Sequence, residues 1–255
     1  MTPPLVRLEA DGPVGRLILD RPPLNVLNLP MLDQLIEQLA QVRRRAGLKV
    51  LLVSGAGKAF CAGVDVADHT ADRVAGMLDR FHRAILDLMA LEIPVVAAVQ
   101  GAALGGGCEL AMACDIVLAR DDARLGQPEI QLAVLPPVAA ALLPRLIGRQ
   151  AALDLILTGR VVSGGEAREA GLVRLVWPEQ HFAREVEAYV ARLAGLSGPV
   201  LRLAKDVVDG GLRRTFPEAL AEAERRYLDD LMALRDPHEG LAAFLAKRPP
   251  VWQEA

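Results

Sequence analysis

The chain has 255 residues, with 29 basic and 32 acidic side chains, a formal net charge of −3 and a hydrophobic fraction of 52%. This composition is that of a folded chain with one large domain, or one domain and a small appendage, and it excludes disorder as the dominant state. A general nucleic-acid binder carries a basic excess, so we expect no nucleic-acid partner; the longest basic run, Arg43-Arg44-Arg45, is explained more simply as a solvated helix end.

Strands and helices are expected to alternate along the first 180 residues. The turn at Asp11-Gly12-Pro13 separates two short strands, at 6–9 and 15–20, and Pro30 opens a helix that ends at about Arg45. Later strands are predicted at residues 50–54, 95–99, 116–119 and 172–176. Helices are predicted at about 71–90 and, two or three in number, between 138 and 170. This alternation indicates an α/β fold.

From residue 181 onward the pattern is entirely helical. The expected helices cover about 181–195, 199–209, 216–235 and 237–246. We therefore predict an α/β core over residues 1–195 and a C-terminal helical subdomain over 196–255. One helix of that subdomain carries an apolar stripe of Leu220, Ala223, Tyr227, Leu231 and Leu234. The stripe packs either on its own core or on another subunit.

The cysteines and the apolar segments indicate the cellular compartment in which the protein is expected. The chain has three cysteines, Cys61, Cys108 and Cys114. Their odd number and spacing favour buried thiols in a reducing cytoplasm over disulfides or a zinc site. The first four residues do not resemble the start of a signal peptide. The most apolar stretch, residues 93–119, contains Glu109 and Asp115, so we expect no membrane partner.

Two glycine-rich loops follow two predicted buried strands. Gly55-Ala56-Gly57-Lys58 lacks the spacing and the following Ser or Thr of a phosphate-binding P-loop, and neither loop matches a dinucleotide fingerprint. Glycines let a ligand approach the backbone, so Ala62-Gly63-Val64 and Gly105-Gly106-Gly107 could each present a free N–H. Two converging N–H groups would form an oxyanion hole for a thioester enolate. The alternative is a pair of tight turns.

Two glutamates lie in apolar surroundings. Glu109 interrupts the apolar run 104–113, and Glu129 follows Gly126-Gln127-Pro128. Two carboxyl groups that face one substrate can divide the roles of base and acid. Structural, hydrogen-bonded carboxylates are the alternative. The four histidines are scattered without metal-ligand spacing, so no metal site is expected; they are His69, His82, His181 and His238.

Six ordered motifs resemble the crotonase family, the enoyl-CoA hydratase/isomerase superfamily, over nearly the whole chain. They begin at Arg21-Pro22 with Asn25-Val26-Leu27-Asn28 and at Ala59-Phe60-Cys61-Ala62-Gly63-Val64-Asp65. The central ones are Gly101-Ala102-Ala103-Leu104-Gly105-Gly106-Gly107-Cys108-Glu109 and Gly126-Gln127-Pro128-Glu129. The last two are Leu157-Thr158-Gly159-Arg160 with Glu166-Ala167, and Asp236 with Glu239-Gly240 and Lys247-Arg248. Together they are much more specific than any single glycine motif.

The resemblance implies a spiral of ββα units and a C-terminal helical part that builds homotrimers or, as dimers of trimers, homohexamers. It implies an acyl-CoA substrate with no cofactor besides the coenzyme A of that substrate. The oxyanion donors would be the N–H groups of Val64 and Gly106, and the catalytic glutamates Glu109 and Glu129. Because many relatives lack one or both glutamates, the pair favours hydration of an unsaturated thioester over isomerisation or hydrolysis. The implied coenzyme A contacts are Leu24, Val26, Ala62, Asp65 and Val66.

Three positions depart from the common hydratase pattern. Pro137 stands where those enzymes have a glycine whose N–H helps to hold the water, and proline has no N–H to offer. Ala67 stands where many relatives have a lysine near the coenzyme A phosphates, and His69 falls near the expected acyl entrance, where a surface or capping role is the alternative to a functional one.

The segments 64–70 and 126–145 are most similar to cyclohexa-1,5-diene-1-carbonyl-CoA hydratases. These enzymes add water across a conjugated ring diene. The alternatives are a linear-chain enoyl-CoA hydratase, an enoyl-CoA isomerase or, against the retention of both glutamates, a non-catalytic scaffold.

Overall fold

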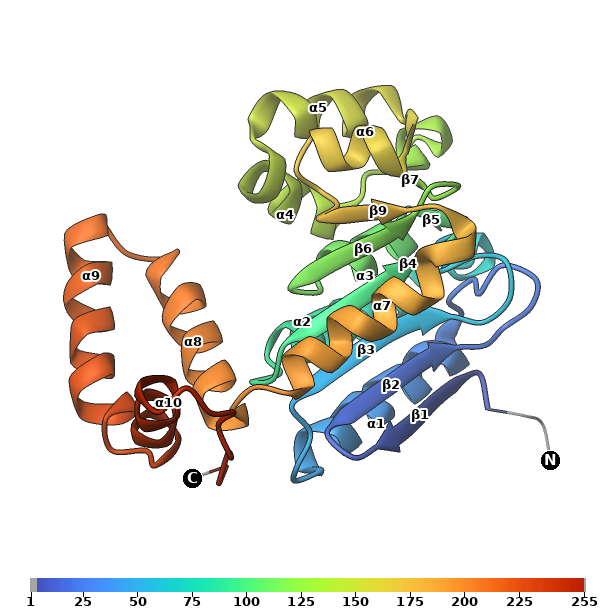
Figure 1. The fold of residues 1–255 in the computed structure, drawn as a ribbon. Coiled ribbons are helices and arrows are strands. Elements are labelled where there is room, and N and C mark those ends of the chain that lie inside the picture. Colours follow the sequence, from blue (N-terminus) through green and yellow to red (C-terminus); the bar gives the residue numbers. More distant parts are fainter. Residues whose placement is uncertain (1–3, 255) are drawn as a thin grey trace.

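The structure, a computed structural model, describes residues 4–254 and is built around a six-stranded sheet (Figure 1). The strand order is β1-β2-β3-β4-β6-β9. β1 and β2 form an antiparallel hairpin, and every later pair in this sheet is parallel. The strands are β1 (Val6–Asp11), β2 (Val14–Leu19), β3 (Val50–Gly55), β4 (Val95–Val99), β6 (Ile116–Arg120) and β9 (Leu175–Trp177). Fully buried apolar runs such as that of β4 are typical of parallel strands covered on both faces.

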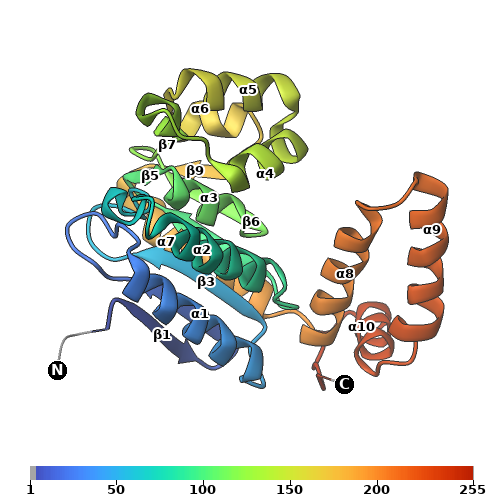
Figure 2. The same cartoon turned by 180° about the vertical axis from the view of Figure 1, so that it is seen from behind.

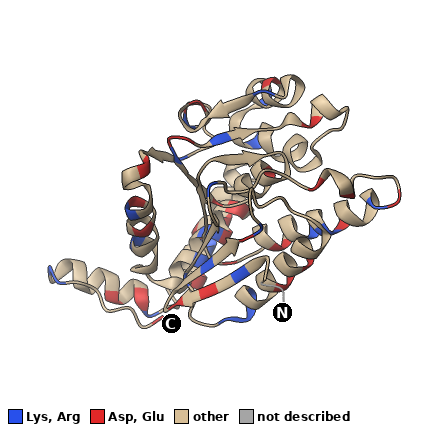
Figure 3. Ribbon diagram, turned by 90° about the vertical axis from the view of Figure 1, so that its right-hand side faces the viewer, with Lys and Arg blue, Asp and Glu red and all other residues tan. Residues whose placement is uncertain are grey.

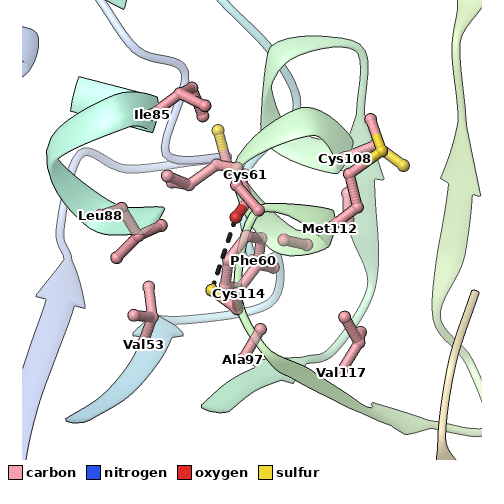
Figure 4. Packing of buried hydrophobic residues seen from close by; sticks show 14 of the residues in the cluster. Val53, Phe60, Cys61, Ile85, Leu88, Ala97, Cys108, Met112, Cys114 and Val117 are labelled. Atoms are coloured by element: carbon pink, nitrogen blue, oxygen red, sulfur yellow. Dashed lines mark hydrogen bonds between the residues drawn. The ribbon is translucent and has the colours of Figure 1, made fainter. Parts of the chain in front are cut away.

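Helices cover both faces of this sheet. Helix α7 (Glu179–Ala194) crosses one face, whereas α1 (Leu29–Arg44), α2 (Val74–Met89) and α3 (Gly106–Met112) lie on the other (Figures 1 and 2). Asn28 caps α1 by accepting the N–H of Met31 at 3.1 Å. The core on the α1–α3 face is continuous and reaches the glycine loops: Figure 4 shows Phe60, Cys61, Cys108 and Met112 in the same cluster as Leu88 of α2.

A second, three-stranded sheet lies beside the first and was absent from the sequence prediction. It consists of β5 (Ala102–Leu104), β7 (Arg124–Gly126) and β8 (Val161–Ser163) in the order β5-β7-β8. Three residues are too short for a strand period to be recognised. Helices α4 (Pro137–Ile147), α5 (Arg149–Thr158) and α6 (Gly164–Glu169) are arranged around it. The prediction of two or three helices in this region is confirmed.

Two predicted boundaries are wrong. The strand expected at 172–176 begins only at Leu175, because the N–H groups of Leu172 and Val173 bond back to the carbonyl of Ala167 and hold the chain in a turn. The helix expected over 216–235 divides into α9 (Phe216–Arg225) and a π-helical turn, η3 (Arg226–Leu231). The remaining helices of this part are α8 (Gly198–Gly211) and α10 (Asp236–Leu245).

Helices α8–α10 stand to one side of the sheet in both views (Figures 1 and 2). Several of their large apolar side chains are exposed, including Leu212 at 83%, Phe216 at 77% and Phe244 at 82%. Leu220 and Tyr227 of the apolar stripe are also exposed, and Tyr227 and Leu231 line a cavity of about 400 Å³ between these helices. The stripe therefore packs on its own subdomain only in part. In residues 4–254 no helix has the length and apolar character needed to cross a bilayer.

Candidate active site

The two glycine loops lie side by side because a backbone bridge joins them. The N–H of Cys61 donates to the carbonyl of Ala102 at 3.0 Å, and the N–H of Leu104 donates to the carbonyl of Cys61 at 3.1 Å. This pairs Cys61 with Ala103 in parallel register. Val64 and Gly106, each three residues beyond the bridge, are in contact: a Cβ added to Gly106 would lie 2.6 Å from Cγ2 of Val64.

The N–H groups of Val64 and Gly106 are both available to a ligand. Leu27 donates to the carbonyl of Gly63 and accepts from the N–H of Asp65, each at 2.8 Å, so the intervening Val64 N–H points to the opposite side. Gly106 is the first residue of α3, where an N–H has no partner within the helix. Among residues 4–254 neither N–H is bonded to a backbone acceptor. Such a pair is suited to holding the oxygen of a thioester enolate.

Glycine is required on both sides of Gly106. Gly105 has a φ of +51°, which favours glycine, and a Cβ there would overlap Oε1 of Glu129. A Cβ on Gly107 would overlap the carbonyl oxygen of Cys61. The three glycines thus bring the backbone of one loop against the other loop and against Glu129.

Glu109 is buried, with 3% of its surface exposed, and is held by the first turn of α4. Its Oε1 accepts the N–H of Ala139 at 2.7 Å. Burial raises the pKa of Glu109 to about 7; the Ala139 N–H opposes this rise and the charge of Glu129 adds to it. A carboxyl with a pKa near neutrality is suited to general base catalysis. Pro137 is the first residue of α4, so the helix binds Glu109 through a residue further along.

Glu129 lies in a short 3₁₀ helix, η2 (Pro128–Leu132), which follows β7. Its Oε1 is next to Gly105, and its Oε2 is buried without a hydrogen-bond partner in the described part of the chain. Burial raises the pKa of Glu129, and the nearby charge of His69 lowers it. A raised pKa favours the protonated form, which a carboxyl needs if it is to act as an acid. Both predicted glutamates lie beside the paired N–H groups: Glu129 is next to Gly105, and Glu109 is on the helix that Gly106 begins.

Of the five residues expected to contact coenzyme A, four are in two adjoining loops and Val66 begins the short 3₁₀ helix that follows the second loop. The N–H of Ala62 donates to the carbonyl of Leu24 at 3.0 Å, which joins the opening loop to the first glycine loop. Val66 is 63% exposed and the other four are half-buried. The carboxylate of Asp65 is already engaged, since it accepts the N–H of Ala67 at 3.2 Å and pairs with Arg21 at 3.3 Å. Arg21 also donates to the carbonyl of Val26 at 2.7 Å.

Sequence reasoning did not assign a role to Asn25 beyond its place in a motif. Asn25 is fully buried and has a φ of +54°, a conformation that asparagine tolerates. Its amide nitrogen donates to the carbonyls of Ala56, Ala59 and Phe60, and its oxygen accepts the N–H of Arg21. Asn25 thereby fixes the opening loop against the loop that carries Val64.

Gln127 was also missed. It is fully buried, and in residues 4–254 neither its amide nitrogen nor its amide oxygen has a hydrogen-bond partner. It lies close enough to Cys108 to lower the pKa of that thiol, although burial dominates and raises it to about 12. The signal that could have found it is a polar residue between β7 and Glu129, two positions before the glutamate.

No group of three or more His, Cys, Asp or Glu side chains within residues 4–254 is arranged to hold a metal ion. A cavity of about 600 Å³ lies at the C-terminal end of α3, where Met112, Asp115 and Arg174 line it, and it includes none of the predicted site residues. The predicted site residues lie instead around the N-terminal end of α3, where Gly106 begins the helix.

A sheet extended by parallel crossover units, two bridged glycine loops and a helical C-terminal part define the crotonase class of α/β proteins. The family model described as enoyl-CoA hydratase/isomerase matches residues 9–255. The chain belongs to the enoyl-CoA hydratase/isomerase family and is an enzyme of that hydratase/isomerase type.

Individual relatives match over almost their full length. A probable enoyl-CoA hydratase of Mycobacterium tuberculosis is 38% identical over 256 residues, which cover 98% of each chain. The cyclohexa-1,5-dienecarbonyl-CoA hydratase of Thauera aromatica is 35% identical, over 99% of this chain and 97% of that protein. The crystal structure of an enoyl-CoA hydratase from Bacillus anthracis superposes with a TM-score of 0.93 at 33% identity and covers 98% of this chain and 100% of that one. The predicted fold is confirmed.

Proposed function

We propose that this enzyme adds water to an α,β-unsaturated acyl-CoA thioester, with Glu109 as base and Glu129 as acid. The observation that carries the proposal is the position of both carboxyl groups beside two available N–H groups. Glu109 lies on the helix that Gly106 begins, and Glu129 contacts the neighbouring Gly105. An isomerase moves one proton between carbons, whereas hydration needs a group to activate water as well as a group to protonate carbon, so two carboxyl groups favour hydration.

The proposed reaction divides the addition of water between these groups. The N–H groups of Val64 and Gly106 donate to the thioester oxygen, which becomes the enolate oxygen. Glu109 takes a proton from water as the water oxygen bonds to carbon, and Glu129 gives a proton to the carbon next to the thioester. One water molecule is consumed, and the protons held by the two carboxyl groups are then redistributed. These steps use only groups of the protein, water and the thioester itself, so we propose no cofactor besides the coenzyme A of the substrate.

The pH dependence of this reaction follows from Glu109. The base must be ionised, and burial raises its pKa to about 7, so kcat/KM should fall as the pH is lowered through about 7, by about tenfold per pH unit well below that value. The measurement is kcat/KM for crotonyl-CoA between about pH 5.5 and about pH 9 in buffers of constant ionic strength. A flat profile across neutral pH in the parent enzyme would contradict a base with this pKa.

For the acyl group we propose a cyclic dienoyl thioester, and a linear enoyl thioester is the second candidate. Similarity of the chain to both the Thauera and the Mycobacterium proteins supports each of them. The segment after Glu129 favours a broad apolar acyl group: Leu132 and Leu135 are 62% and 67% exposed, and Pro136 and Pro137 follow them. Exposed leucines next to the half-buried Glu129 are suited to contact an apolar ligand.

A screen by mass spectrometry separates these substrates. Cyclohexa-1,5-diene-1-carbonyl-CoA and crotonyl-CoA are offered side by side, and gain of one water is followed, with Glu109→Gln as the inactive control. We expect the cyclic diene to be hydrated faster. Faster hydration of crotonyl-CoA would make this a linear-chain hydratase with an unusual loop. If neither thioester gains water, the proposed hydration itself is wrong.

We also propose that the chain assembles as a homotrimer or a dimer of trimers through its C-terminal helices. The exposed side chains of Leu212, Phe216 and Phe244 support this, because a monomer would leave a large apolar surface in water. A cytoplasmic location is proposed from the three cysteines, which are all buried and free in the described structure. Acidic and basic residues are interspersed along the elements in Figure 3, and we propose no nucleic-acid or membrane partner.

A further inference from the structure

The direction of the Val64 N–H depends on the opening loop, residues 21–27. The parallel bridge between Leu27 and Val64 consists of two backbone bonds: Leu27 donates to the carbonyl of Gly63 and accepts the N–H of Asp65, each at 2.8 Å. Both neighbours of Val64 are therefore bonded to one residue of the opening loop. Because of these two bonds, a movement of Leu27 would also turn the Val64 N–H.

Arg21 joins the two sides of this bridge. Its Nη1 donates to the carbonyl of Val26, the residue before Leu27, at 2.7 Å. Its Nη2 lies 3.3 Å from Oδ2 of Asp65, the residue after Val64. The guanidinium is planar and its N–H groups have fixed directions, so it can hold two acceptors at a set separation. One side chain thus links the opening loop to the loop that carries Val64, directly beside the bridge.

Both ends of this link are themselves held in place. The backbone N–H of Arg21 donates to Oδ1 of Asn25 at 2.9 Å, and the fully buried Asn25 donates to three carbonyls of residues 56–60. At the other end, Oδ1 of Asp65 accepts the N–H of Ala67 at 3.2 Å and caps the short 3₁₀ helix η1 (Val66–Asp68). The link therefore has a defined geometry at the base of the Arg21 side chain and at the carboxylate that it reaches.

The exposure of this pair argues against a mainly structural role. The side chains of Arg21 and Asp65 are 31% and 29% exposed, and ion pairs that water reaches contribute little to stability. A different role for an arginine here is to bind a coenzyme A phosphate, because Val26 and Asp65 are among the expected coenzyme A contacts and guanidinium groups bind phosphates well. These two roles make different predictions for a substrate that has no phosphates.

We propose that Arg21 is a positioning residue for the oxyanion site and holds the Val64 N–H in the direction of the thioester oxygen. This inference rests on the proposed function, in which that N–H stabilises the enolate. Arg21 acts through Leu27 and Val64 and does not itself touch the reacting atoms. Without Arg21 the N–H is still present but less well aligned, so the loss of rate should be smaller than the cost of about 10²–10³-fold for losing a donor.

The first test is kinetic. Arg21→Met removes both hydrogen bonds and keeps an apolar stem, and we expect kcat for hydration to fall by about tenfold while KM changes by less than about twofold. The loss should be the same for crotonyl-CoA and for crotonyl-pantetheine, a thioester without phosphates. Arg16→Met is the matched control and should act like the parent: Arg16 is 27% exposed in β2 and pairs at 2.7 Å with Glu187 of α7, on the opposite face of the sheet from α3.

The second test follows the polarisation of the thioester itself. Hydrogen bonds to a carbonyl oxygen weaken its C=O bond, so butyryl-CoA labelled with carbon-13 at the thioester carbon should show a lower infrared stretching frequency on the enzyme than in water. Butyryl-CoA has no double bond to hydrate, so its complex persists during the measurement. We expect Arg21→Met to lose about half of this lowering. Arg21→Lys keeps a charge beside Asp65 but cannot hold both acceptors in one plane, and should fall between Arg21→Met and the parent.

The outcomes separate this inference from the proposed function. If the parent enzyme does not lower the frequency, Val64 and Gly106 do not hold the thioester oxygen and the proposed function is wrong. If the parent lowers it and Arg21→Met matches the parent in frequency and kcat, Arg21 is not a positioning residue. A loss confined to KM for crotonyl-CoA, and absent with crotonyl-pantetheine, would make Arg21 a phosphate ligand and overturn the proposal. A lower kcat with a lower melting temperature but an unchanged frequency would indicate a structural role and overturn it as well. Arg21→Lys carries the same tests if Arg21→Met does not fold.

Discussion

Replacing Glu109 with glutamine is expected to lower the turnover number for hydration by at least about 10²-fold, the scale of general base catalysis. The amide oxygen of glutamine can still accept the N–H of Ala139, which Glu109 accepts at 2.7 Å, so the first turn of α4 keeps its contact. The amide cannot take a proton from water. Substrate binding should change much less than turnover, because the proposed oxyanion donors, the N–H groups of Val64 and Gly106, are unchanged.

The stability of Glu109→Gln gives an independent check on the same side chain. A carboxyl whose pKa is raised by folding destabilises the fold increasingly as the pH rises from its unfolded pKa to its folded pKa, and in full above the folded pKa, because burial opposes its ionisation. The pKa of Glu109 is raised to about 7, so above neutral pH the variant should melt at the same temperature as the parent or higher. At acidic pH, where the carboxyl is protonated in both states, this advantage disappears.

Glu37→Gln is the matched control for this variant, since Glu37 is an exposed glutamate on α1. It should hydrate like the parent. Stopped-flow absorbance of the enoyl thioester measures turnover, and circular dichroism measures folding. If Glu109→Gln folds and keeps more than about a tenth of the parental turnover, Glu109 is not the base.

The parts of the fold that could be predicted from the sequence are those with long, one-sided or fully apolar patterns. The predicted strand at residues 95–99 coincides with β4, and the helix opened by Pro30 is α1 to within a residue at each end. The three-residue strands β5, β7 and β8 carry no such pattern, because their stability comes from pairing with segments distant in the sequence. The second sheet, which positions Glu129, was therefore invisible to local reasoning.

The candidate site divides in the same way. Glu109 and Glu129 could be found because a carboxylate in an apolar run is costly without a partner. The partner of Glu109 could not, since Ala139 lies 30 residues further on and is presented by a helix that begins at a proline. The sequence shows that Pro137 has no N–H. It does not show that Ala139, in the same turn, binds Glu109, because that contact depends on how α4 packs against α3. His69 could be placed near the entrance, but its pairing with the Asp65 carbonyl needed coordinates.

The second large effect is expected at Gly106. A methyl group there would lie 2.6 Å from Cγ2 of Val64 and 3.3 Å from the ring of Phe81, so in Gly106→Ala the Val64 side chain or the two loops must shift. We expect the shift to disturb the proposed convergence of the Val64 and Gly106 N–H groups on one oxygen. Loss of one oxyanion donor typically costs about 10²–10³-fold in kcat, and we expect kcat for hydration to fall within that range.

Val64→Ala separates the steric effect from the loss of glycine itself. It removes Cγ2 but keeps the N–H of residue 64, so alone it should leave hydration close to the parental rate. Combined with Gly106→Ala it removes the nearest collision, and we expect the double variant to regain at least about tenfold of the lost rate, a non-additivity typical of residues in contact. Gly165→Ala is the matched control, because Gly165 also lies in the first turn of a helix and a Cβ there meets nothing closer than Oγ of Ser163 at 3.8 Å. Parental activity in Gly106→Ala, or a double variant no faster than Gly106→Ala, would show that these two backbone groups do not act on one substrate oxygen.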